Sequence, residues 1–590
     1  MVAKAIIHGF MAGEVSPAMA LRSEVLGMKY GAKEITNWNS TLQGPVETRY
    51  SLAQGVNQLA LTVYPGQAYG YVSKLNSSGN LEYYFVELTT TTIYISVYDS
   101  FTGTWVSETT ISKSVPVSAF SGVINCLQPP GKEELWIFFE KNQVPLKVYY
   151  STTWQVADIS WIWMPTDWGY VSGSDTYYTK AVCFFANRLW QASASIYSHK
   201  FWGSQTDKFT DFSLGASLPS EAIEHTLPNP GIIQWLAASK NLVIGTDAAE
   251  YIVTAQEGVI IPGDIQVDQQ STHGSIHHKI AQSSGTIFFI TKNGKGVRSM
   301  SFEWTKKAWT SKDMMFASEH LVQDYALSQI VYHEYGDMLL ALREDGKILR
   351  GIYNAEDESI GWSTWGHSLF PSDTNTPEFK ALGVGPVAIG NASLVGYIQY
   401  TAVSATEYMQ TLSYLESANL DNSTVYETTG VKSRDVLLDF VHVEKNATAF
   451  SSLTSIGLTN RTGLTAIIDG VIYTDQSLSG STYTMPVSGN LCLIGVPVTG
   501  QVKVETLSRL IATGEFTQVH KKRWARVFAH IVDSYAPTIE GKVSTISKDT
   551  RDIQLSTLGW DRVKTLTLTH VSPYRSVVAG IFGNLGEDSV

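Results

Sequence analysis

Short apolar runs recur along the middle of the chain at a regular distance. Counting from the start of one run to the start of the next gives about 45 to 56 residues. Each run has the length and the β-branched or aromatic content of a buried strand. The runs begin at Tyr83 (YYFVEL), Leu135 (LWIFFE), Leu189 (LWQASAS), Leu242 (LVIGT), Ile287 (IFFIT), Met338 (MLLAL) and Leu394 (LVGYIQY).

Two of the runs lead into a tight turn and a second strand. Asn293-Gly294 follows the fifth run and Asp345-Gly346 follows the sixth, and both dipeptides are strong hairpin signals. Each repeat is therefore expected to form a small antiparallel sheet. A degenerate repeat of this size, made of strands, is typical of a β-propeller, whose blades stack because one blade cannot bury both of its faces. A solenoid and a chain of separate sandwiches are the alternatives.

The pattern changes near residue 400. A polar stretch at 415–429 precedes alternating strand patterns at 436–442, 464–473 and 491–507. We therefore predict a mainly β protein with four parts: an N-terminal arm and docking segment (1–55), a β-propeller (56–400), a β domain acting as platform or tip (401–500) and a C-terminal β platform segment (501–590). The basic cluster at 520–526 is either a solvated face or a contact for an anionic partner or another subunit.

Composition supports this fold class, because aromatic residues, Ser and Thr are plentiful and only 16% of the residues are charged. The formal net charge of −12 argues against a protein that binds nucleic acid tightly through its phosphates. It does not argue against a protein along which DNA moves without being held. Cys126, Cys183 and Cys492 are far apart and are expected to be buried, reduced thiols. We find no secretory signal and no apolar run of membrane-spanning length, and so expect synthesis in the cytoplasm.

Motifs for catalysis or cofactor binding were not found. The chain has no Walker A loop, no dinucleotide fingerprint, no HExxH and no EF-hand loop. His273, His277 and His278 lie together but lack Cys or carboxylate companions at ligand spacing, so a surface turn is the preferred interpretation over a metal site. The acidic turns at 343–346 and 355–358 are interpreted as hairpin tips or loops rather than glycosidase carboxylates. We expect no enzyme activity and no cofactor.

One stretch near the start, 10–22 (FMAGEVSPAMALR), fits neither a strand nor a good helix. With its companions further on, it resembles the N-terminal signature of the tail nozzle family of short-tailed phages, also called tail tubular protein B. Matching segments follow in the same order through the chain, at 187–212, 235–250, 464–470, 494–497 and 570–573. The residues that carry the resemblance are Phe10, Gly13, Glu14, Ser16, Pro17, Arg22, Glu24, Tyr30, Gly44, Arg49, Lys522, Arg523, Trp560 and Arg562.

The resemblance implies a structural role in the virion. Members of the family form a sixfold ring at the distal end of the short tail, below an adaptor ring, with fibres or spikes at the side, and DNA leaves through the channel. It implies as partners five further copies of the chain, the adaptor ring, the fibres, the genomic DNA and the host cell surface. The wall of a channel that conducts DNA should expose few pairs of Lys or Arg side chains. Many such contacts with the phosphates would together bind the DNA and stop it from moving through the channel.

The irregular arm must find hydrogen-bond partners outside itself, on its own C-terminal β domain or on a neighbouring subunit. Our hypothesis is that Gly13 and Pro17 shape its turn, and that Glu14 and Arg22 fix it through charge-assisted contacts. An alternative function is a propeller-type glycan-binding or glycan-degrading tail protein. That function would need converging carboxylates and aromatic platforms, and the 16 Trp and 29 Tyr residues keep it open.

Overall fold

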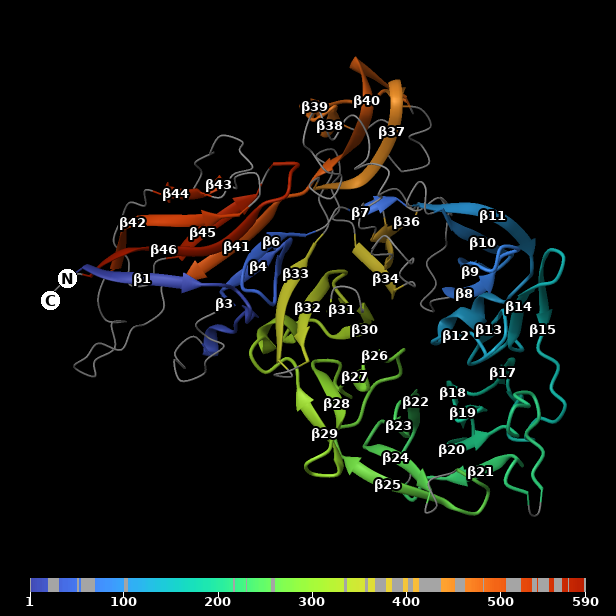
Figure 1. The fold of residues 1–590 in the computed structure, drawn as a ribbon. Helices are drawn as coiled ribbons and strands as arrows, with labels where there is room; N and C mark the ends of the chain where they lie inside the picture. The colour runs from blue at the N-terminus through green and yellow to red at the C-terminus, as the bar shows by residue number, and fades with distance from the viewer. Residues whose placement is uncertain are drawn as a thin grey trace, which may run out of the picture.

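The computed structural model describes most of the 590 residues. The described residues are 2–19, 31–49, 52–54, 69–99, 104–215, 218–229, 231–255, 260–333, 337–355, 359–366, 378–384, 396–401, 407–412, 437–450, 462–480, 482–505, 522–532, 538–539, 551–555, 565–570 and 572–587. Three bodies are visible in Figure 1: a ring of sheets, a tip above it and a platform beside it.

The ring is a β-propeller. Within the described residues, seven four-stranded antiparallel units follow one another around a common axis, and each runs outward from its first strand to its last (Figure 1). In chain order the blades are β8 (Tyr69–Leu75), β9 (Leu81–Leu88), β10 (Thr92–Asp99) and β11 (Thr104–Ser112); β12 (Asn125–Leu127), β13 (Glu134–Phe138), β14 (Leu146–Tyr150) and β15 (Trp154–Asp158); β18 (Ala181–Phe185), β19 (Arg188–Ala194), β20 (Tyr197–Gly203) and β21 (Ile223–Thr226); β22 (Ile233–Ala238), β23 (Leu242–Thr246), β24 (Glu250–Ala255) and β25 (Ile265–Ser271); β26 (Ala281–Ser283), β27 (Thr286–Ile290), β28 (Val297–Glu303) and β29 (Ala308–Asp313); β30 (Leu327–His333), β31 (Met338–Arg343), β32 (Ile348–Asn354) and β33 (Ser359–Trp365); and β34 (Glu378–Val384), β35 (Gly396–Thr401), β36 (Glu407–Leu412) and β7 (Leu52–Gln54).

The seven apolar runs of the sequence are the second strands of the seven blades: β9, β13, β19, β23, β27, β31 and β35. The two predicted hairpins are also present, with Gly294 between β27 and β28 and Gly346 between β31 and β32, both at positive φ. The prediction of a mainly β fold with a propeller is therefore confirmed. The repeat was detectable because the second strand of a blade is covered on both faces.

Strand β13 shows how one strand serves two cores. Leu135 and Ile137 pack in the core between the first and second blades, whereas Trp136 and Phe138 pack in the core between the second and third. The same alternation continues around the ring, since further cores join blades three and four, four and five, and five and six. Successive side chains point to opposite faces of a strand, so a strand inside a stack of sheets must be apolar throughout.

The last blade is completed by a strand from the other end of the propeller sequence. Strand β7 pairs antiparallel with β36, with Thr411 opposite Ala53, although nearly the whole propeller lies between them in the chain. The propeller thus reaches Leu412, past the expected boundary at residue 400, and takes its outermost strand from within the expected arm. Strand β7 also pairs with β37 (Leu438–Phe450), which belongs to the tip.

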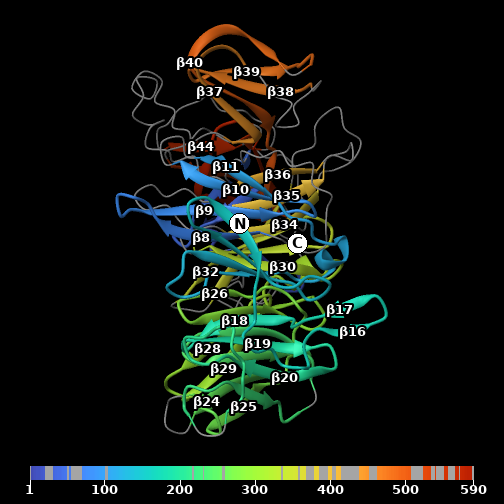
Figure 2. The same ribbon diagram turned by 90° about the vertical axis from the view of Figure 1, so that its right-hand side faces the viewer.

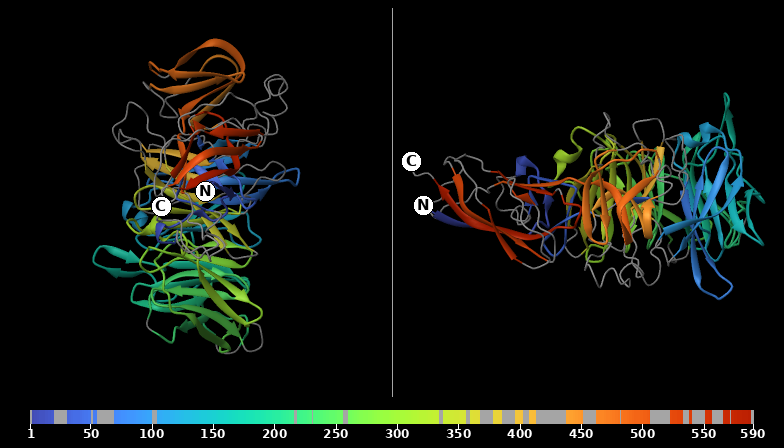
Figure 3. Two further views of the ribbon diagram at one scale, coloured as in Figure 1. Left: turned by 90° about the vertical axis from the view of Figure 1, so that its left-hand side faces the viewer. Right: turned by 90° about the horizontal axis from the view of Figure 1, so that it is seen from above.

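Apart from one hairpin at the side of the ring, the tip and the platform hold the other described strands. The tip consists of β37 with β38 (Leu464–Ile468), β39 (Val471–Gln476) and β40 (Tyr483–Pro497). The platform combines both ends of the chain, and the two termini lie beside each other in Figure 3. Its strands are β1 (Val2–His8), β2 (Gly13–Glu14), β3 (Gly31–Ala32), β4 (Glu34–Thr36), β5 (Trp38–Ser40), β6 (Val46–Thr48), β41 (Gly500–Glu505), β42 (Lys522–Ile531), β43 (Thr538–Ile539), β44 (Arg551–Leu555), β45 (Thr565–His570) and β46 (Val577–Glu587).

The remaining elements are short. A hairpin of β16 (Tyr170–Ser172) and β17 (Asp175–Tyr177) projects from the side of the ring (Figure 2). The 3-10 helices are η1 (Pro17–Met19), η3 (Val117–Ser121) and η4 (Glu319–Val322). In the described part of the chain, no helix has the length and apolar character needed to cross a bilayer.

We predict that Ala53→Pro weakens the last blade. Strand β7 lies between β36 and β37, and proline there removes a ladder hydrogen bond, leaving its partner unsatisfied at a cost of about 1 to 3 kcal/mol. The thermal unfolding midpoint should fall, and limited proteolysis should cut between the propeller and the tip sooner than in the parent chain. Ala53→Ser keeps the backbone N–H and is the matched control. Equal protease resistance of the two variants would contradict the role of β7.

Candidate functional site

The opening motif lies at the meeting point of platform, propeller and tip, which we call the junction. Phe10 is completely buried in the platform core with Ile35 and Trp38. Its backbone N–H donates to the carbonyl of Gly44 at 2.5 Å. Gly9 has φ of 81°, and a Cβ there would lie 2.9 Å from the Gly44 Cα, so the two backbones touch only because both residues are glycine.

Gly13 binds the arm to the outermost strand of the sixth blade. It pairs in parallel with Trp362 of β33, at a φ of 66°. A Cβ on Gly13 would lie 2.3 Å from the Trp362 carbonyl oxygen, closer than any real contact. Pro17 begins the short helix η1, and the Ser16 N–H donates to the Ala317 carbonyl at 2.8 Å. The arm therefore extends the propeller surface as an added strand.

Glu14 is buried, and its polar atoms have partners on two bodies. One carboxylate oxygen accepts the Ile35 N–H at 2.9 Å, and the other lies 3.1 Å from Nε2 of His320 in η4. The Glu14 backbone carbonyl accepts a hydrogen bond from the Ser318 hydroxyl at 2.6 Å. A carboxylate whose two oxygens contact a backbone N–H and an imidazole nitrogen is fixed in both position and direction. Glu14 thus holds the arm in a fixed position between the platform and the propeller.

Arg49 joins all three bodies. Its Nη2 atom donates to the two carboxylate oxygens of Asp439 at 2.8 and 2.7 Å, and both side chains are fully buried. Its Nε atom donates to Oδ1 of Asn37 at 3.0 Å. Asn37 in turn accepts the N–H of Gly366, just after β33 of the sixth blade, and donates to the carbonyl of Thr499, just before the platform strand β41. The guanidinium group suits this role because it is planar and rigid, so its N–H donors point in fixed directions.

The other signature residues are placed as follows. Lys522 and Arg523 open β42, which pairs with β46, opposite Glu587 and Gly586. Arg22, Glu24, Tyr30, Trp560 and Arg562 lie outside the described residues, and the expected contact of Arg22 stays a prediction. Sequence reasoning named Arg49 only as part of the signature. It did not find Asp439, because a single acidic residue in a strand gives no signal of its distant partner.

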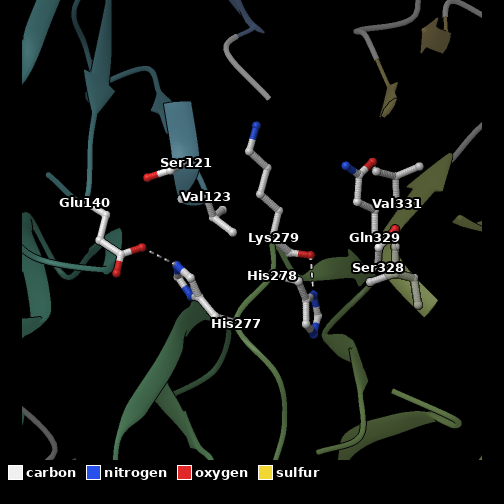
Figure 4. A pocket seen from close by; sticks show the side chains of 11 residues that line it. Ser121, Val123, Glu140, His277, His278, Lys279, Ser328, Gln329 and Val331 are labelled. Carbon is white, nitrogen blue, oxygen red and sulfur yellow. Dashed lines mark hydrogen bonds and ion pairs between the residues drawn. The ribbon is translucent and has the colours of Figure 1, made fainter. Parts of the chain in front are cut away.

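A second site lies inside the ring, in a cavity of about 310 Å³ that we call the axial cavity (Figure 4). Its walls come from inner strands or from residues just before them in the second, fifth and sixth blades, together with Glu140 at the end of β13. The lining residues are Ser121, Gly122, Val123, Glu140, His277, His278, Lys279, Ser328, Gln329, Ile330 and Val331. A neighbouring hollow shares His277, His278 and Lys279 and adds Cys126.

His273 is exposed, as a surface turn requires, but His277 and His278 turn inward, contrary to the sequence-based expectation. His278 is buried: its Nε2 accepts the Ile290 N–H at 3.0 Å, and its Nδ1 lies 2.6 Å from the Lys279 carbonyl. Since a backbone N–H occupies Nε2, the ring is neutral with its proton on Nδ1. The segment turns inward because it leads into β26, the inner strand of its blade.

His277 and Glu140 face each other across one wall of the axial cavity (Figure 4). His277 Nε2 lies 3.8 Å from a Glu140 oxygen, and Lys180 Nζ lies 3.3 Å from the other. Burial lowers the pKa of His277, and Glu140 opposes that effect. Burial raises the pKa of the Cys126 thiol, so it is a poor nucleophile. Among the described residues no group of three His, Cys, Asp or Glu could hold a metal ion.

The fold and the junction define a β-propeller protein whose two chain ends combine into one platform. No family model matches the sequence, and no curated protein matches it. Among solved structures, a streptogramin B lyase is similar with a TM-score of 0.34 and 12% identity, over 60% of this chain and 96% of that one. Sqt1 of Saccharomyces cerevisiae is similar with a TM-score of 0.31 and 10% identity, over 58% and 83%. The assignment of the fold rests on the strand order and the blade cores described above.

We predict that Arg49→Met destabilises the protein by about 3 to 5 kcal/mol, because it leaves the Asp439 carboxylate buried without its cation. The thermal unfolding midpoint measures the change. The double variant Arg49→Met with Asp439→Leu should recover much of the loss. Lys306→Ala, which removes an exposed pair with Glu303, is the control and should change little. A loss in Arg49→Met no larger than that of the control would contradict the role of the buried pair.

We also predict that the protein loses stability as the pH falls from 7 to 5. Burial lowers the pKa of His278, His333 and His570 from 6.5 to about 4, so the unfolded chain binds these protons first. The contribution of each neutral histidine to the free energy of unfolding is fully present above pH 6.5 and is lost as the pH falls toward 4. Between pH 7 and pH 5 the loss is roughly 2 kcal/mol for each histidine. Thermal unfolding at several pH values measures this. His278→Gln should give a shallower dependence, and an unchanged slope would contradict the assignment.

Proposed function

We propose that this protein is a structural component of a short phage tail, the subunit of a sixfold nozzle through which DNA is ejected. The single observation that best supports the proposal is the position of the signature residues. All four are buried: Phe10 in the platform core, Gly13 and Glu14 between the platform and the propeller, and Arg49 where these two bodies meet the tip. A ring subunit that bears mechanical load needs residues that hold its rigid bodies in fixed relative positions.

The junction suits a structural role better than catalysis. Its ionisable side chains are already engaged: Arg49 is held by Asp439, and Glu14 by Ile35 and His320. A catalytic acid or base needs room for a substrate within hydrogen-bond reach. We infer that the protein is not an enzyme and that its platform carries the contacts to neighbouring subunits and to the adaptor ring. Fibres or spikes would bind at the side, and loops of the propeller or tip would close the channel before ejection.

The channel of such a ring would be formed by six copies, so each subunit's charge on its wall is multiplied sixfold. An acidic or neutral wall repels the DNA backbone and lets it slide, whereas rings of Lys and Arg would hold it. The formal net charge of −12 fits a conduit of this kind. The axial cavity inside one propeller is far too small to be that channel.

A second candidate function, binding of host glycans, is supported by a hollow on the propeller surface. It has a volume of about 530 Å³ and is lined by Asp313, Glu319 and Arg298. Phe316 lies beside them with 57% of its surface exposed, and an exposed aromatic ring is what a sugar face packs against. Release of reducing sugar from host polysaccharide would favour a glycan-degrading protein over the nozzle, and binding without release would favour a receptor-binding one.

We expect immunogold labelling of intact phage particles to place the protein at the tip of the short tail. Antibody against the purified chain is the probe, and particles treated with pre-immune serum are the control. Label on lateral spikes would support the glycan-binding alternative. Label on no particle at all would contradict a role in the virion.

A further inference from the structure

The fifth blade exposes a tryptophan that the proposed structural role does not use. Trp304 begins the turn between β28 and β29, which has the sequence Trp304-Thr305-Lys306-Lys307, and 74% of its surface is exposed. No other large hydrophobic side chain in the described part of the chain is so exposed. We propose that this turn binds an acidic glycan, with a sugar ring packed on the Trp304 indole and a carboxylate of the sugar beside the lysines. The inference does not depend on the tail role, and its site is not the hollow at Phe316.

The exposed indole is held in place by its neighbours. Its ring meets Phe302 edge to face, with the ring centroids 5.0 Å apart, and Phe302 meets the buried Trp309 in the same way at 6.1 Å. The Lys240 ammonium, from the turn between β22 and β23, lies 3.8 Å from the centre of the Trp304 ring and 3.7 Å from that of Phe302. A cation over an aromatic face is attracted by the quadrupole of the ring. The indole is therefore oriented before any ligand binds, which lowers the entropic cost of binding.

The charge of the turn complements an anionic ligand. Lys306 and Lys307 belong to the turn and Lys240 lies against it, whereas the segment 303–308 holds one carboxylate, that of Glu303. Lys306 forms an ion pair with Glu303 at 2.8 Å. In the described part of the chain neither Lys240 nor Lys307 has an ion-pair partner. These two ammonium groups therefore give the surface around the indole an excess of positive charge, although the whole chain is acidic.

Glu303 favours a sugar over other anions. Its carboxylate accepts hydrogen bonds from Lys306 at 2.8 Å and from the Thr305 hydroxyl at 2.9 Å, and both bonds lower its pKa. An ionised carboxylate accepts hydrogen bonds from sugar hydroxyls, whereas it repels the phosphates of nucleic acids and lipids. Single-stranded nucleic acid also needs a basic groove with several stacking rings, and a bilayer surface needs more apolar area than one indole. The turn therefore fits a single acidic sugar unit best.

The test is calorimetric titration of the full-length chain with two acidic probes, trigalacturonate and a hyaluronan tetrasaccharide, each at millimolar concentration. Maltotriose, which carries no charge, is the control. We expect saturable binding of at least one acidic probe that weakens as salt is added, and binding of maltotriose that is at least tenfold weaker. The proposal is overturned if neither acidic probe binds, or if maltotriose binds as tightly as they do.

Variants of exposed residues assign the binding to the turn, and thermal unfolding verifies that each is folded. Trp304→Ala removes the ring and should weaken binding at least tenfold, whereas Trp304→Phe keeps an aromatic face and should lose less. Lys307→Met removes a charge and should weaken binding of the acidic probes severalfold. Phe316→Ala is the matched control and should leave binding unchanged. Loss of binding in Phe316→Ala but not in Trp304→Ala would place the sugar in the hollow at Phe316 and overturn the assignment to the turn.

Two further probes test the other anionic partners. These are vesicles of phosphatidylcholine with phosphatidylglycerol, and oligothymidylate. We expect both to bind more weakly than the acidic sugars, because Glu303 repels their phosphates. Binding of either probe that is tighter than that of the sugars and is lost in Trp304→Ala would overturn the proposal in favour of a lipid or nucleic-acid contact.

Discussion

Every blade of the propeller has two apolar faces, and the need to cover both of them determines the rest of the structure. A single four-stranded sheet cannot exist alone in water with Leu135 and Ile137 on one side and Trp136 and Phe138 on the other. Stacking one blade on the next solves the problem for all but the two blades at the ends. The stack curves into a ring, and strand β7 completes the last blade from the N-terminal side.

The use of β7 has consequences beyond the ring. Because this strand lies at the end of the expected arm segment, the chain enters the propeller beside the last blade. The chain leaves the propeller at the same place to form the tip and then the platform. Arm, tip and platform thus meet at one location, and Arg49, Asn37 and Asp439 occupy it. A buried ion pair with additional hydrogen bonds gives less stability than apolar packing would, but it specifies one relative orientation.

The two interior sites differ in whether the elements that meet there leave a cavity between them. At the junction the guanidinium of Arg49 and the carboxylate of Glu14 meet protein partners, which fits a purely mechanical part. In the axial cavity, residues of the second, fifth and sixth blades line a shared space of about 310 Å³.

The sequence by itself determined the repeat, the fold class and the position of the second strand in every blade, because doubly covered strands are apolar throughout and recur at a fixed distance. It also singled out the opening motif as an unusual, irregular arm. The partners of that arm were decided by the tertiary structure: Trp362, His320 and Asp439 are hundreds of residues away and lie in ordinary strands or turns. The inward direction of His278 was likewise invisible, because a histidine beside a strand has the same local pattern whether its blade turns it toward water or toward the axis.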